Sequence, residues 1–213
     1  GWYSSTATIS VLARKSRKAS EQEATEYVAA MLLAVSMMFL RFMILILIFS
    51  REIFLSIYPY LLIMSVVSAI VGWFVHSRQK LPKDTSVESE EDDSSNPLEF
   101  KVALIFAVLF VVFTVLTHYT LVYAGTSGLN LLSFVSGFSD ITPFILNLLQ
   151  NTGSVAVLII TACSMQAIVS NILVNMFYAL FFAGKRSKLR PWILGGFGAV
   201  IACNLVLLLF FYL

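Results

Sequence analysis

Five apolar stretches, each long enough to cross a lipid bilayer, dominate this sequence. A spanning helix needs about 20 consecutive apolar residues, and the stretches cover residues 27–49, 53–75, 98–123, 154–183 and 192–212. Charged residues make up 12% of the chain, against roughly 25% in soluble domains. No strand-like alternation is present, so the pattern predicts an all-α, polytopic membrane helix bundle.

A hydrophilic segment at residues 76–97 divides the chain. It is first basic, then acidic and rich in serine, a composition typical of solvated linkers. We therefore expect a first repeat at residues 1–75, a charged cytoplasmic linker at 76–97 and a second repeat at 98–213. Gly1 opens directly into a polar motif without an initiator methionine, so we expect the first repeat to be truncated at its N-terminus.

The two halves share an order of elements that indicates inverted repeats. When Gly1 and Gly137 are aligned, Ser4 matches Asp140 and Thr6 matches Thr142. Basic clusters at 14–18, 78–83 and 185–190 fall on one side of the membrane, by rule the cytoplasmic side, if residues 128–150 enter and leave on the same side. Each repeat then crosses three times, so tandem copies are inverted, each with a broken or re-entrant helix.

The helix is expected to break at Gly137 and Pro143, because glycine is flexible and proline lacks an N–H group. The alternative is that residues 129–150 form an ordinary, kinked transmembrane helix.

Asp140 is the one acidic residue of 12 that lies deep inside an apolar segment, here residues 129–150, and charges at bilayer depth usually mark a site or a pathway. On a helix, Ser136, Asp140 and Asn147 fall on one face, with Ser133 and Ser139 beside it. Such oxygen groups suit a hard cation or a proton relay, with Asp140 as a tentative metal ligand. Alternatively, Asp140 is protonated or caps a helix end.

Other polar residues in the apolar stretches complete the candidate site. Arg41 lies nine residues from Ser50, or roughly 13 Å along a helix, so it either extends to the headgroups or pairs with Asp140. Hydroxyl groups near the N-terminus and a stripe of asparagines offer neutral ligands, or serve helix packing. The predicted ion-binding set is Asp140, Ser4, Ser5, Thr6, Ser136, Ser139, Thr142, Asn171 and Asn175, with Arg41 as a counter-charge or gate.

Three segments carry a resemblance to a known family. They are Ser4-Ser5-Thr6-Ala7-Thr8 with Leu12-Ala13-Arg14, then Met38-Phe39-Leu40-Arg41, and Ser136-Gly137-Phe138-Ser139-Asp140. Here the chain resembles MgtC/SapB-family membrane proteins, in particular their C-terminal uncharacterised domain. The resemblance implies a magnesium-linked membrane protein. The family's second motif tends to carry another acidic residue where this chain has Thr142, which argues against a two-carboxylate metal site here.

These observations predict a bacterial inner-membrane transporter or channel for a small inorganic ion, most readily a cation or proton, with the site between the repeats near the bilayer midplane. The rival function is a non-transporting scaffold or regulatory partner; an anion carrier is a third. Without a Cys/His cluster, a Ser-His-Asp set or a phosphate-binding loop, we expect no enzyme and no cofactor. The expected partners are the bilayer, the ion and further copies of the chain, but no nucleic acid.

Overall fold

The computed structural model describes residues 5–16, 21–77, 97–150, 155–184 and 189–212, and within these ranges every regular element is helical. The helices are α1 (Ser5–Lys15), α2 (Glu21–Phe49), α3 (Arg51–Ser77), α4 (Pro97–Ser136), α5 (Ile141–Gln150), α6 (Val157–Ala183) and α7 (Arg190–Tyr212). Five of them, α2, α3, α4, α6 and α7, contain stretches long and apolar enough to cross a membrane. The predicted all-α membrane helix bundle is therefore confirmed.

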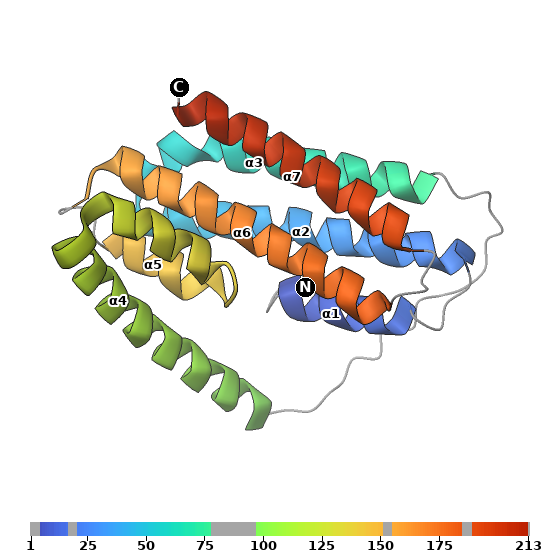
Figure 1. Cartoon of the computed structure of the whole chain (residues 1–213), viewed down its shortest axis with the longest axis horizontal. Coiled ribbons are helices and arrows are strands. Elements are labelled where there is room, and N and C mark those ends of the chain that lie inside the picture. The colour runs from blue at the N-terminus through green and yellow to red at the C-terminus, as the bar shows by residue number, and fades with distance from the viewer. Residues whose placement is uncertain (1–4, 17–20, 78–96, 151–154, 185–188, 213) are drawn as a thin grey trace.

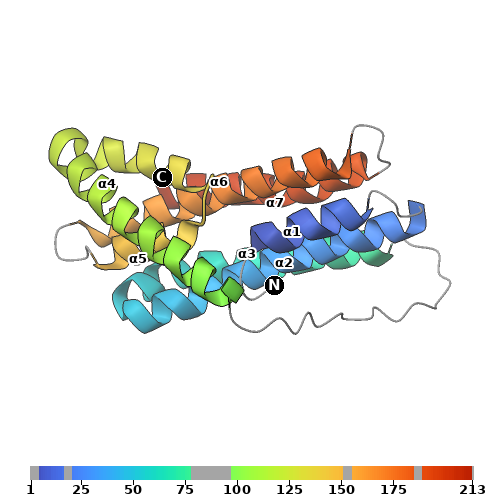
Figure 2. The same ribbon diagram turned by 90° about the horizontal axis from the view of Figure 1, so that it is seen from below.

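The long helices α2, α3, α6 and α7 run side by side along the bundle (Figures 1 and 2). α2 packs against α3, and α6 packs against α7. Polar contacts join the helices inside this apolar core: Ser36 Oγ donates to Ser65 O at 2.9 Å, and the Tyr60 hydroxyl donates to Asn204 Oδ1. Large apolar side chains on the outer faces, such as Ile48 and Trp73, are exposed. An exposed apolar exterior suits lipid as the solvent.

Two short helices start near the middle of the bundle and run to opposite ends. α1 packs against α2 and α6, and α5 packs against α4, α6 and α2 (Figure 1). This paired arrangement is what two inverted repeats require, although the division into repeats at residues 1–75 and 98–213 stays a prediction.

α4 is two helices joined at a bend. Gly125 inside it has φ 58° and ψ −148°, which is not helical. The chain turns there, and residues 126–136 run back toward the middle of the bundle (Figure 1). We call residues 126–136 the first arm and α5 the second arm of a helical hairpin. The sequence between the two arms, residues 137–140, forms the tip of the hairpin, and the hairpin enters and leaves at one end of the bundle, as the re-entrant hypothesis proposes.

Replacing Gly125 with alanine should destabilise the bend, because only glycine tolerates this backbone conformation without strain. A Cβ there would meet no atom within 4 Å, so the effect isolates the backbone. We expect a loss of about 1–3 kcal/mol, measured as a lower midpoint of thermal unfolding in detergent. Gly195→Ala is the matched control, since Gly195 also has open space but no positive φ. Equal midpoints for the two variants would contradict this account of the bend.

Candidate functional site: a cavity at the hairpin tip

The tip of the hairpin is built from two helix ends. The first arm finishes in a tightened turn, in which the N–H groups of Gly137, Phe138 and Ser139 each donate to a carbonyl three residues earlier. The second arm then begins with a side-chain cap: Asp140 Oδ1 accepts a hydrogen bond of 2.9 Å from the Thr142 N–H. Aspartate is among the preferred residues at this position because it satisfies an N–H that the helix leaves unpaired. Asp140 therefore caps a helix end, which is one of the alternatives that the sequence allows.

Side chains of α6 hold the tip at mid-depth. Asn171, near the middle of α6, donates from Nδ2 to the Gly137 carbonyl at 3.2 Å. Asn175 Nδ2 in turn donates to Asn171 Oδ1 at 3.1 Å, which orients the amide. The residue before Asn171 contributes as well, since Ser170 Oγ donates to Phe134 O at 2.6 Å. Gly137 packs so closely on Ser170 that the two backbones leave no room for a side chain between them.

Arg41 of α2 reaches the beginning of the second arm. Its Nη2 lies 4.0 Å from Asp140 Oδ1 and donates a hydrogen bond to Thr142 Oγ1. The side chains of Arg41 and Asp140 are 28% and 41% exposed, and both border the same cavity. The contact joins α2 to α5 and sets two opposite charges together, which reduces the cost of each at this depth.

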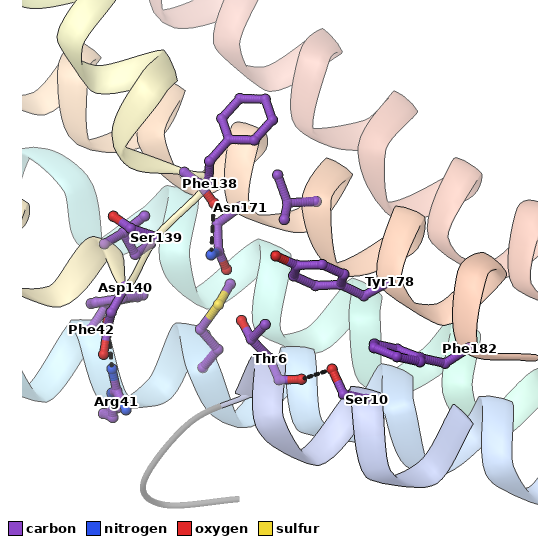
Figure 3. A pocket seen from close by; sticks show the side chains of 14 residues that line it. Thr6, Ser10, Arg41, Phe42, Phe138, Ser139, Asp140, Asn171, Tyr178 and Phe182 are labelled. Atoms are coloured by element: carbon purple, nitrogen blue, oxygen red, sulfur yellow. Dashed lines mark hydrogen bonds and ion pairs between the residues drawn. The ribbon is translucent and has the colours of Figure 1, made fainter. Parts of the chain in front are cut away.

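A cavity of about 490 Å³ lies beside this pair. It is lined by Thr6, Ser10, Met38, Arg41, Phe42, Gly137, Phe138, Ser139, Asp140, Ile141, Asn171, Val174, Tyr178 and Phe182. Four elements contribute: α1, α2, the hairpin and α6. Figure 3 shows the Tyr178 hydroxyl pointing toward Asn171 and Thr6, with Asp140 and Arg41 on the other side of Asn171. The cavity therefore combines one carboxylate and one guanidinium group with neutral hydroxyl and amide groups.

The structure places the predicted site residues in two groups. Asp140, Thr6, Ser139, Asn171 and Arg41 line the cavity. Thr142 and Asn175 are buried behind it, where they hold Arg41 and Asn171. Ser4 lies outside the described residues; Ser5 begins α1, and its side chain is not among those described.

Two sequence-based expectations about the hairpin are wrong. Ser136, Asp140 and Asn147 do not share a helix face, because the helix ends at Ser136 and a new one starts at Ile141. Ser136 Oγ donates to Ser133 O instead, and Asn147 Nδ2 donates to Thr114 Oγ1 of α4. Pro143 does not break the helix either. It lies in the first turn of α5, where proline is tolerated since its missing N–H would have no partner within the helix.

Sequence reasoning missed Tyr178 and Phe182 as members of the site. A signal was available: Asn171, Asn175, Tyr178 and Phe182 follow one another at offsets of four, three and four, so they share a face of α6. Ser10, Phe42 and Phe138 also line the cavity without having been proposed. Ser10 lies one turn after Thr6 and donates from Oγ to its carbonyl at 2.8 Å (Figure 3).

The donor set has limited capacity for a multivalent metal. Asp140 is the single acidic side chain among the residues that line the cavity. Within the described ranges, no group of three or more His, Cys, Asp or Glu residues is placed to hold a metal ion. A proton or a weakly coordinated ion needs fewer oxygen ligands from the site than a chelated divalent ion does.

Fold and site together define a multi-pass, all-α membrane protein with a helical hairpin whose tip lies against a polar cavity. The chain belongs to the family described as "Domain of unknown function (DUF4010)", which matches residues 1–183. It is also similar to an "Uncharacterized protein" of Aquifex aeolicus (strain VF5), with 29% identity over 115 residues, covering 53% of this chain and 50% of the relative. The chain thus aligns with about half the length of that relative. No solved structure matches it.

Proposed function

We propose that this protein moves a small inorganic ion, a cation or proton, across the membrane through the cavity at the hairpin tip. The observation that carries the proposal is the position of Asp140, whose side chain is 41% exposed and lines a cavity of about 490 Å³ that begins at the middle of α6. A scaffold would keep this carboxylate buried and dry. In membrane proteins, ionisable groups that face such a cavity are typical of transport pathways.

The surroundings of Asp140 favour a positively charged solute. In the described part of the chain, Asp140 makes one hydrogen bond, to Thr142 N–H, and one ionic contact, to Arg41, both through Oδ1. An arriving cation or proton can therefore meet the carboxylate from the cavity and compete with Arg41 for it. With a single carboxylate already paired, a proton or monovalent cation fits better than a divalent ion.

The charge pattern and the relatives support a bacterial inner membrane as the location. Helices α1 and α7 carry Arg14, Lys15 and Arg190 at one end of the bundle, and Arg51 lies at the other (Figure 1). Basic ends usually face the cytoplasm, which would orient the cavity-lining half of α6 toward that side. The resemblance to MgtC/SapB-family proteins and the similarity to a bacterial chain agree with this location.

The test is solute flux in proteoliposomes that contain the whole chain, over a panel of cations, anions and pH gradients. Asp140→Asn is the informative variant, because an asparagine oxygen still caps α5 while the charge is gone. We expect Asp140→Asn to lower flux at least about tenfold, which corresponds to about 1.4 kcal/mol, and to lower thermal stability because Arg41 loses its counter-charge. The solute whose flux depends on Asp140 identifies the transported class.

Glu52→Gln serves as the matched control, since it removes an exposed carboxylate at the start of α3, away from the cavity. It should leave flux unchanged. Absence of flux for every solute in the wild-type protein would refute transport and support the scaffold instead. Flux of an anion that falls when Arg41 is replaced, but not when Asp140 is, would assign the anion carrier.

A further inference from the structure

A second, smaller cavity of about 190 Å³ lies at the base of the hairpin. The first arm lines it with Thr126 and Asn130, and the first two turns of α6 line it with Leu158, Ile159, Thr161, Ala162 and Met165. The tip cavity is lined by Asn171, Val174, Tyr178 and Phe182, which belong to the other half of α6. The two cavities therefore open along opposite halves of the same helix.

The small cavity contains polar groups that can form hydrogen bonds with water or a solute. Thr161 is 4% exposed, lines the cavity, and its Oγ1 has no hydrogen-bond partner among the described residues. Asn130 faces the same space and uses its Oδ1 to accept from Cys163 Sγ at 3.3 Å. A buried hydroxyl without a partner is costly in an apolar environment. The volume accommodates several water molecules at about 30 Å³ each.

The two cavities are close together along the axis of α6. The stretch between them extends from Met165 to Asn171, six residues or about 9 Å along the axis. Here α6 packs on the first arm through polar contacts, since Ser133 Oγ donates to Gln166 Oε1 at 3.1 Å and Ser170 Oγ donates to Phe134 O.

The first arm has the features of a part that can move. It is bounded by Gly125, where the backbone leaves the helical conformation, and by Gly137 at the tip. Glycines at both ends let the chain absorb changes in φ and ψ while the arm itself stays helical.

Building on the proposed function, we propose that the small cavity is the second mouth of the translocation pathway, where Asn130 and Thr161 bind the hydrated cation or pass the proton. The seam between the first arm and α6, closed in this conformation, is the barrier between the two mouths. Opening of the seam would connect the small cavity to Asp140. Closure at the other end of α6 would complete alternating access.

A native cysteine, Cys163, can report whether this barrier opens. Cys163 is fully buried in the seam, and Cys203 is the other cysteine of two in the sequence. In a Cys203→Ala protein, a charged, membrane-impermeant methanethiosulfonate can react only with Cys163. We expect slow modification, seen as a mass shift, when the reagent is applied at the mouth near Leu158, and loss of flux as the thiol is blocked. The same reagent applied to a Cys163→Ala protein should leave flux unchanged.

Ser133→Ala sharpens the test, because it removes the hydrogen bond to Gln166 that helps hold the seam closed. We expect about two- to tenfold faster modification of Cys163, the range that the loss of one hydrogen bond allows in a two-state opening. Ser56→Ala is the matched control, since Ser56 is exposed on α3 and bonds only to Glu52 O of its own helix. It should not change the rate.

The outcomes separate this inference from the proposed function. If flux is measured but Cys163 stays unmodified, or is modified without effect on flux, the pathway does not pass through the seam and only this inference fails. If no solute is transported, the proposed function fails and the second mouth fails with it. Modification that is faster in Ser133→Ala and that blocks flux supports both.

Discussion

Replacement of Gly137 by alanine is expected to abolish flux. An alanine Cβ would lie 2.3 Å from Ser170 Oγ, 2.4 Å from Ser170 Cβ and 2.7 Å from the Asn171 backbone nitrogen. Two of these contacts are with parts of α6 that cannot rotate away, so the tip itself must move. Its movement would break the hydrogen bond between Asn171 Nδ2 and Gly137 O and displace Asp140 from the cavity. Overpacking of this kind typically costs about 1–3 kcal/mol.

The measurement combines flux in proteoliposomes with the midpoint of thermal unfolding. Gly198→Ala is the matched control, because a Cβ at Gly198 meets no atom within 4 Å, and alanine is favoured over glycine in a helix by roughly 0.5–1 kcal/mol. Adding Ser170→Gly to Gly137→Ala removes the two closest atoms and should restore part of the flux. Wild-type flux in Gly137→Ala would show that the tip does not need its close contact with α6.

Removal of Arg41 is expected to have the second largest effect, since it leaves Asp140 without its counter-charge inside the membrane. Breaking a fully buried pair costs about 3–5 kcal/mol. Here the side chains are 28% and 41% exposed and 4.0 Å apart, so about 1–3 kcal/mol is the expected loss for Arg41→Leu. The loss should be seen as a lower melting temperature in detergent.

A double-mutant cycle distinguishes the pair's structural role from its transport role. Combined with Asp140→Asn, Arg41→Leu should cost less than it does alone, because no carboxylate is left unpaired. Stability should therefore recover while flux does not. Arg41→Lys keeps the charge but loses the planar guanidinium that reaches Asp140 and Thr142 together. Additive effects of the two substitutions would show that Arg41 and Asp140 do not act as a pair.

The spanning helices were predictable because their signal is local. Residues 27–49 and 53–75 are mostly apolar and carry no charged residue apart from Arg41, and α2 and α3 cover them. The position of the tip was predictable for a similar reason: Gly137 lies between two short apolar segments, next to a carboxylate that has to be accommodated.

The composition of the site was only partly predictable, because it depends on how separate helices meet. Asp140, Arg41 and Asn171 were identifiable as polar residues in apolar surroundings. The aromatic side chains of Tyr178 and Phe182 are ordinary in a membrane helix, and only the fold brings them to the cavity. The expectation for Ser136 and Asn147 failed since it assumed an uninterrupted helix across residues 137–140, where the chain in fact turns.

One atom, Asp140 Oδ1, makes two contacts in this protein: it accepts a hydrogen bond from the Thr142 N–H in the first turn of the second arm, and it lies 4.0 Å from Arg41 Nη2. A neutralised carboxyl is a weaker acceptor than a carboxylate. A proton taken up from the cavity would therefore loosen the start of α5 at the same moment as it frees Arg41. Protonation of this one carboxyl group would thus weaken the start of α5 and the contact between α5 and α2 together.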